Sequence, residues 1–144
     1  MSERVLVSGG RDVVASLDRG DADGVVVACP PHPQMGGNRS DSRLTAASEA
    51  LGERGIACLR FDYGPWDEGR GERADALHAI DWARERYDTV GLFGYSFGAS
   101  VALVAASESD GLRGVSVLSP GARVVGHADV VAALERIDAP TQVV

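Results

Sequence analysis

Residues 89–106 decide the fold, and they read TVGLFGYSFGASVALVAA. A short apolar run leads into Gly94-Tyr95-Ser96-Phe97-Gly98, and an apolar segment that is too long for one strand follows directly. This succession predicts a strand, an abrupt turn and a buried helix. The glycines two positions before and after Ser96 leave room for a tight, strained turn that holds the serine hydroxyl away from the backbone. The pattern is typical of a nucleophile elbow, in which a base and oxyanion donors act on the serine.

The five-residue pattern is weak evidence when it stands alone, because glycine occupies 18 of the 144 positions. The strand-like run before the pattern and the buried helix predicted after it carry the interpretation. An alternative stays open at this point. The segment is then an ordinary glycine-rich turn between a strand and a helix, and Ser96 acts as the helix N-cap.

Strands and helices alternate along the rest of the chain. Short β-branched runs at 5–8 and 13–17 predict a hairpin, and the unbroken apolar run at 25–29 predicts a strand covered on both faces. The other expected strands are 56–61, 90–93, 115–118 and 141–144, and the expected helices run from 40 or 41 to 52 or 55, then over 72–87, 99–106 and 130–137. This order predicts a single α/β domain over residues 1–144, with a doubly wound, mostly parallel sheet.

The helix over 72–87 is amphipathic. Its spacing predicts that Ala74, Leu77, Ile80 and Ala83 face the core and that the arginines near its end face outward. A loop at 30–38 follows the strand at 25–29, and its prolines and glycines predict an absence of regular structure. A second loop at 62–71 combines aromatic rings with charge, as a pocket rim does, and a third lies at 119–121. Such loops follow central strands, where α/β folds build their sites.

Composition restricts the partners and the compartment. All 14 basic residues are arginine, and the net charge is −7. An acidic surface argues against a nucleic-acid or an anionic-membrane partner. The composition resembles that of proteins from salt-loving archaea. Cys29 and Cys58 lie in apolar runs, which predicts buried free thiols. We find no signal peptide and no apolar run long enough for a membrane helix, so the expected location is cytoplasmic.

Three motifs occur in order along the chain. They are Pro31-His32-Pro33 with Gly36-Gly37, the segment 59–64 with Glu68-Gly69, and the elbow around Ser96. Together they resemble the small α/β-hydrolase family related to dienelactone hydrolases, from about residue 25 onward. The resemblance implies the α/β-hydrolase fold, with a C-terminal part missing. It also implies a serine hydrolase that forms an acyl-enzyme on Ser96 from a carboxylic ester, a thioester or a similar small-molecule acyl substrate.

The resemblance also implies roles for particular residues. Ser96 matches the nucleophile, and the N–H of Phe97 matches one oxyanion donor. The second donor is implied to come from the loop after Cys29, where proline has no N–H, so Gln34 or Met35 is the candidate. His32 is expected to shape this loop rather than to act as the base. The residues expected around the pocket are His32, Met35, Tyr63, Trp66 and Tyr95.

Some features depart from the family or leave alternatives open. Dienelactone hydrolases proper have a cysteine at the elbow, which puts lactone hydrolysis in doubt. Tyr63 and Trp66 either line a pocket or pack their own loop. No residue cluster has metal-ligand spacing, and no glycine loop has the phosphate-binding pattern, so neither a metal nor a cofactor is expected.

The partners of Ser96 are not evident after the elbow. The family order is serine, then an acid, then histidine. Glu108 and Asp110 are predicted at the opposite edge of the sheet, and His127 is expected to be an exposed residue near a helix start. Asp129 and Asp138 have ordinary roles as a helix cap and a turn residue.

Three hypotheses therefore stand. The first is a serine hydrolase whose acid and base lie in sequence that is not present here. The second is a non-catalytic remnant of the fold that binds a small acyl ligand or a protein partner. The third is a protomer that forms a homo-oligomer through the open edge of its last strand.

Overall fold

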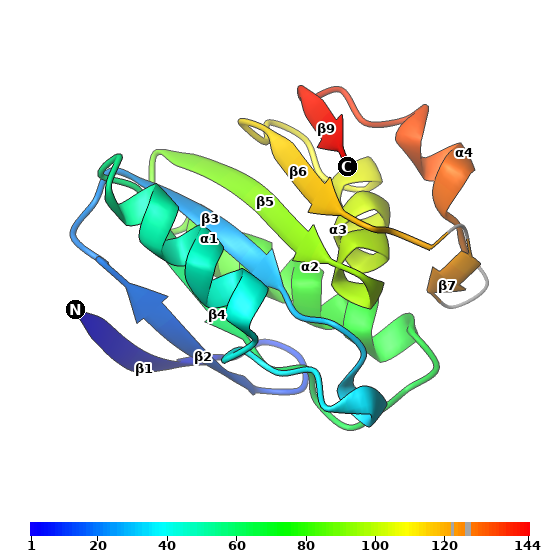
Figure 1. The fold of residues 1–144 in the computed structure, drawn as a ribbon, viewed down its shortest axis with the longest axis horizontal. Helices are drawn as coiled ribbons and strands as arrows, with labels where there is room; N and C mark the ends of the chain where they lie inside the picture. Colours follow the sequence, from blue (N-terminus) through cyan, green and yellow to red (C-terminus); the bar gives the residue numbers. More distant parts are fainter. Residues whose placement is uncertain (122, 126–127) are drawn as a thin grey trace.

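The structure is a computed structural model that describes residues 1–121, 123–125 and 128–144, without the side chains of 123–125 and 128. A seven-stranded sheet in the order β1-β2-β4-β3-β5-β6-β9 forms its centre (Figure 1). The strands are β1 (Ser2–Val7), β2 (Val13–Asp18), β3 (Gly24–Cys29), β4 (Ala57–Phe61), β5 (Thr89–Tyr95), β6 (Val115–Leu118) and β9 (Thr141–Val143). Within this sheet the β1–β2 and β2–β4 pairings are antiparallel, and the other four are parallel. The predicted doubly wound, mostly parallel α/β fold is confirmed.

Helices cover the two faces of the sheet unequally. They are α1 (Ser42–Gly52), α2 (Arg70–Arg84), α3 (Phe97–Ser107) and α4 (Val130–Leu134). α1 lies in front of the sheet and α2 and α3 lie behind it (Figure 1). The main hydrophobic core lies on the α2 and α3 side and takes in almost all of α3. The α1 side holds only a small buried cluster of Ala28, Leu44 and Cys58. Since α3 is buried on every side, the elbow is anchored in the densest part of the molecule.

The thin cover on the α1 side leaves a groove in that face. Val27 is buried, but its neighbour Val26 is half-buried, so the prediction that this strand is covered on both faces is wrong at Val26. Val26 lines an apolar groove of about 510 Å³ together with Leu51, Ile56 and Phe93. Ser96 does not line this groove, which runs toward the opposite ends of the strands.

Strand register brings the loops of the candidate site to one edge of the sheet. Cys29 at the end of β3 pairs with Gly94 of β5, and Tyr95 of β5 pairs with Leu118 of β6. These strands are parallel, so the loops that follow β3, β5 and β6 leave the sheet at the same edge. At the far end of the order, β9 is the outer strand. Oligomer formation through that edge stays a prediction.

Three local predictions need correction. The loop at 30–38 contains a 3-10 turn, η1 (Pro33–Met35), because Pro33 has the backbone φ of a first helical residue and His32 caps the turn. α2 begins two residues earlier and ends three residues earlier than predicted. A short hairpin of β7 (Arg123–Val125) and β8 (Ala128–Asp129) was not predicted, because its strands are too short to show a pattern.

The buried face of α2 also differs from the predicted one. Ala74 and Leu77 are only half-buried, whereas Glu72 and Asp75 are 0% and 1% exposed. Ile80 and Ala83 are buried as predicted. The helix is rotated so that two carboxylates point inward, and this is possible because an arginine from another part of the chain meets them.

The two cysteines are buried and free, as predicted. Burial raises the pKa of the Cys58 thiol from 9.0 to about 12, and burial raises the pKa of Cys29 as well. Because the thiolate is the reactive form, we expect neither thiol to react with Ellman's reagent at pH 8 until the protein is unfolded in guanidinium. The unfolded chain loses these protons near pH 9 and the native state does not, so stability should fall as pH rises from about 9 to 12. Rapid reaction in native buffer would contradict this burial.

Candidate active site

Ser96 occupies a strained turn between β5 and α3. Its backbone has φ 59° and ψ −118°, a conformation that non-glycine residues rarely adopt and that costs about 1–3 kcal/mol. A Cβ at Gly94 would lie 2.3 Å from the carbonyl oxygen of Gly98, and one at Gly98 would lie 2.1 Å from that of Cys29. The two glycines are therefore required by close backbone approach, and the strain falls on Ser96 itself.

Both backbone groups of Ser96 are hydrogen-bonded. The Ser96 N–H donates to the Leu118 carbonyl at 2.9 Å, and the Ser96 carbonyl accepts from Ala99 N–H at 3.0 Å. Its side chain makes no capping hydrogen bond to α3, so the alternative in which Ser96 serves only as a side-chain N-cap is wrong. Among the side chains that the structure describes, those of residues 1–121 and 129–144, none hydrogen-bonds to this hydroxyl. Ser96 is half-buried, with its backbone fixed on both sides.

The loop after β3 is organised by His32. Its Nδ1 accepts a hydrogen bond from the Gln34 N–H at 3.1 Å, and its carbonyl accepts from the N–H groups of Met35 at 3.0 Å and Gly37 at 2.9 Å. The side chain therefore shapes this loop. The N–H groups of Gln34 and Met35 are both engaged by His32 in this conformation. In the described part of the chain, the N–H groups of His32 and Phe97 have no acceptor.

Aromatic rings from three loops meet beside the elbow. The His32 ring lies 4.4 Å from that of Trp66 and 4.8 Å from that of Phe97, between centroids. Tyr63 meets Phe97 edge to face at 5.8 Å, and its hydroxyl donates to the Pro30 carbonyl at 2.9 Å. Burial raises the pKa of Tyr63 well above its ordinary value. Tyr63 and Trp66 thus form a wall against the residue that follows Ser96.

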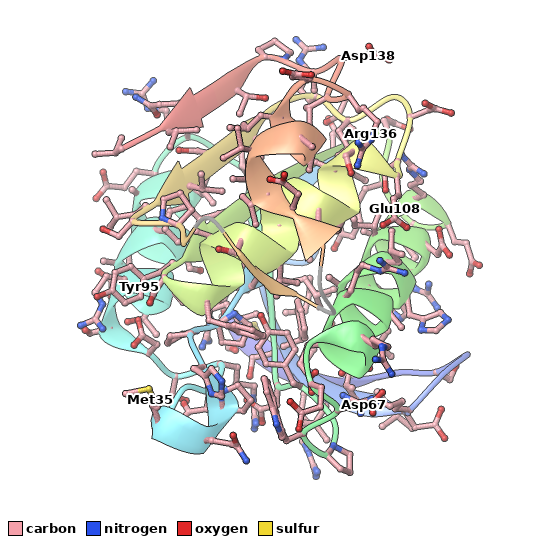
Figure 2. All side chains as sticks on the ribbon, turned by 90° about the vertical axis from the view of Figure 1, so that its right-hand side faces the viewer. Met35, Asp67, Tyr95, Glu108, Arg136 and Asp138 are labelled. Carbon is pink, nitrogen blue, oxygen red and sulfur yellow. The ribbon has the colours of Figure 1, made fainter. Side chains whose placement is uncertain are left out.

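Two of the residues predicted around the pocket lie away from this wall. Met35 is 84% exposed and projects from the 3-10 turn at the margin of the molecule (Figure 2). Tyr95 belongs to the α1 side of the sheet, where the Arg43 guanidinium lies 4.2 Å from the centre of its ring. Gln34 is exposed. The structure therefore brings together the side chains of His32, Tyr63 and Trp66 and keeps those of Met35 and Tyr95 apart from them.

Glu108 and Asp110 lie far from the elbow. Figure 2 shows Tyr95 and Glu108 at opposite ends of α3, and Glu108 pairs with Arg73 at 3.5 Å. Asp129 caps α4 by accepting the Ala132 N–H at 3.2 Å, and Asp138 is exposed. The prediction for His127 lies outside the described residues.

Three polar clusters around the site were missed in the sequence. Arg39 binds Asp62 through its backbone N–H at 2.7 Å and through its guanidinium, which joins the first two loops. Ser100 exchanges two hydrogen bonds with Gly121, at 2.9 and 3.0 Å, which ties α3 to the third loop. The third cluster joins Arg11 to Glu72 and Asp75. For this third cluster the sequence contains one signal. Glu72 lies three residues after Gly69, and this spacing is typical of a helix start.

Neither a metal cluster nor a membrane helix is found in the described part of the chain. Across residues 1–121, 123–125 and 128–144, no three His, Cys, Asp or Glu side chains gather as metal ligands would. None of the helices among these residues combines the length and apolar character needed to cross a bilayer.

Solved structures resemble this arrangement over almost the whole chain. XC6422 from Xanthomonas campestris, an α/β serine hydrolase without a lid, is 27% identical to this chain with a TM-score of 0.79. The similarity covers 99% of this chain and 68% of XC6422. A dienelactone hydrolase from Anabaena variabilis is 21% identical with a TM-score of 0.72, covering 99% and 84%. The esterase Pf2001 from Pyrococcus furiosus is 20% identical with a TM-score of 0.73, covering 85% and 50%. At these lower identities the last two show the fold alone.

Sequence comparison gives one distant relative among curated proteins. The uncharacterized protein RP471 of Rickettsia prowazekii is 25% identical in an alignment 115 positions long, which covers 73% of this chain and 48% of that protein. The chain therefore spans about half the length of this relative. No protein-family profile matches the chain. The sheet order, the strained elbow and the similarity to XC6422 place the chain in the α/β-hydrolase superfamily, whose fold it shares with the dienelactone hydrolase of Anabaena variabilis.

Proposed function

We propose that this chain carries the nucleophile of a serine hydrolase that cleaves a carboxylic ester, a thioester or a similar acyl substrate. The observation that carries the proposal is the strained backbone of Ser96, whose hydroxyl makes no capping hydrogen bond to the buried helix that follows. Strain of this kind persists only where the surrounding structure imposes it. Similarity to the serine hydrolase XC6422 supports the same reaction class.

In the proposed reaction, Ser96 Oγ attacks the acyl carbonyl carbon and loses its proton to a base. The tetrahedral intermediate then expels the alcohol or thiol, which takes up that proton, and leaves an acyl-enzyme. Water hydrolyses the acyl-enzyme to the carboxylic acid and restores Ser96. Since no described side chain hydrogen-bonds to the hydroxyl, the proposal assigns the base and its acid to residues outside the described ones.

Oxyanion stabilisation is proposed to come from the start of α3 and from the loop after β3. The Phe97 N–H lies at the positive end of the α3 dipole and has no acceptor among the described residues. For the second donor, use of Gln34 requires release of its bond to His32 Nδ1. The His32 N–H is the first one after β3, because Pro30 and Pro31 have none, and it needs no such exchange.

Ester turnover tests the proposal. We expect the protein to hydrolyse p-nitrophenyl butyrate and Ser96→Ala to lower kcat/KM by at least about a thousandfold. Ser40→Ala is the matched control, because Ser40 is exposed and lies outside the elbow. Equal turnover by Ser96→Ala and the wild type would contradict the proposed nucleophile.

A second function is favoured by the absence of a described base beside Ser96. In that case the chain is a non-catalytic form of the fold that binds a small acyl ligand or a protein partner. It predicts saturable binding of p-nitrophenyl butyrate without hydrolysis, equally in the wild type and in Ser96→Ala. Turnover that depends on Ser96 would exclude this alternative.

A further inference from the structure

We infer that Arg11, in the turn between β1 and β2, is the positioning residue for the pocket wall that Tyr63 and Trp66 form beside Ser96. Arg11 lies more than 50 residues before this wall in the sequence, and it does not belong to the elbow or to the loop after β3. The inference rests on the proposed function, since it gives this wall the task of holding an acyl substrate.

The guanidinium of Arg11 binds two buried carboxylates at once. Its Nε donates to Asp75 Oδ1 at 3.1 Å, and its Nη2 donates to Asp75 Oδ2 at 2.7 Å and to Glu72 Oε2 at 3.2 Å. Both carboxylate side chains are fully buried, while that of Arg11 is 24% exposed. The hydrogen bond to Asp75 is the main cause that raises the pKa of Arg11. A cation at this point offsets the cost of burying two charges on one helix face.

The same groups hold the loop that carries Trp66. Arg11 Nη1 donates to the Pro65 carbonyl, directly before Trp66. Directly after it, the Asp67 N–H donates to Glu72 Oε2 at 3.0 Å. Further contacts lie at Gly64, whose N–H donates to Asp75 at 2.9 Å, and at Gly69, whose N–H donates to Glu72 at 2.8 Å. The backbone is therefore fixed on both sides of Trp66 by groups that Arg11 holds in place.

The loop is fitted closely around the guanidinium. A Cβ on Gly64 would lie 2.8 Å from Arg11 Nε, and one on Gly71 would lie 2.5 Å from Arg11 Nη1. A lysine in this space keeps the charge but has a single donor atom in place of the planar fork. It cannot reach Asp75, Glu72 and the Pro65 carbonyl in the same geometry.

The wall reaches the elbow through ring contacts. Trp66 lies 5.7 Å from Phe97 and 4.4 Å from His32 between ring centroids. Displacement of the loop therefore moves the surface against which an acyl chain would lie, while Ser96 stays fixed by β5 and α3. Loss of the Arg11 contacts is expected to weaken substrate binding more than it slows the chemical step.

The test uses Arg11→Lys in a Trp82→Phe background, where Trp66 is the single tryptophan. We expect a red shift of Trp66 emission and faster amide exchange at Gly64, Asp67 and Gly69, with exchange in α3 unchanged. In ester assays we expect KM for p-nitrophenyl butyrate to rise about tenfold, with kcat within about twofold. Arg4→Lys is the matched control, because Arg4 is exposed on β1.

A second variant and a comparison with ester turnover distinguish a folding defect and a failure of the proposed function from a failure of this inference. If Arg11→Lys does not fold, the triple variant Arg11→Met, Glu72→Gln, Asp75→Asn removes all three charges and should fold with the same red shift and loop exchange. Unchanged emission and exchange, or exchange that accelerates equally throughout the protein, would overturn the inference. If the wild type gives no ester turnover, the proposed function fails, while emission and loop exchange still decide whether Arg11 positions the wall.

Discussion

Replacement of Gly98 by alanine is expected to lower the free energy of unfolding by about 3 kcal/mol, although alanine is the better helix former. The added Cβ would lie 2.1 Å from the carbonyl oxygen of Cys29 and 2.4 Å from that of Pro30. Both contacts are with backbone, so no side chain can rotate to relieve them. Either α3 or the loop after β3 must shift, and each carries part of the proposed oxyanion site. We therefore expect ester turnover to fall together with stability.

Urea unfolding followed by circular dichroism measures this effect. Gly114→Ala is the matched control, because a Cβ there would meet only the Pro140 carbonyl at 3.7 Å, an ordinary contact. We expect the control to change stability by less than about 0.5 kcal/mol. A Gly98→Ala protein as stable as the wild type would contradict the close approach of α3 to the end of β3.

The parts of the molecule with local signals could be predicted from the sequence. The strand before Ser96 and the buried helix after it each showed their own pattern, and the loop after β3 followed from its prolines and glycines. The mostly parallel sheet and the common edge of the three loops followed from the alternation of strands and helices.

Residues that pair across long stretches of sequence could not be predicted in the same way. Nothing in the sequence placed Glu72 and Asp75 on the buried face of α2, because carboxylates are rarely buried without a partner. Their partner, Arg11, precedes them by 61 and 64 residues, and no sequence pattern links these positions. The orientation of α2 therefore depends on its contact with Arg11 in the β1–β2 turn, which the sequence pattern of α2 does not indicate.

The extent to which each face of the sheet is covered could not be predicted from the sequence either. An apolar run such as that of β3 indicates burial, but it does not state how much of each face is covered. Val27 packs into the main core, whereas Val26 borders the groove beside α1. The sequence pattern is the same for both residues, because the difference lies in which elements pack against each face.

Ser96→Ala is expected to have the largest effect on reactivity. The proposal makes the Ser96 hydroxyl the attacking group, and no neighbouring oxygen occupies its place at the tip of the elbow. Ser100 is the nearest serine in sequence, but it is fully buried and its hydroxyl is bound to Gly121. Covalent labelling should therefore be confined to one residue.

Intact mass spectrometry after treatment with a fluorophosphonate tests whether Ser96 is the nucleophile. We predict a single adduct in the native wild type, mapped to Ser96 by peptide analysis, absent in Ser96→Ala and retained in Ser40→Ala. An unlabelled wild type, or an adduct that persists in Ser96→Ala, would contradict the assignment of Ser96 as the nucleophile.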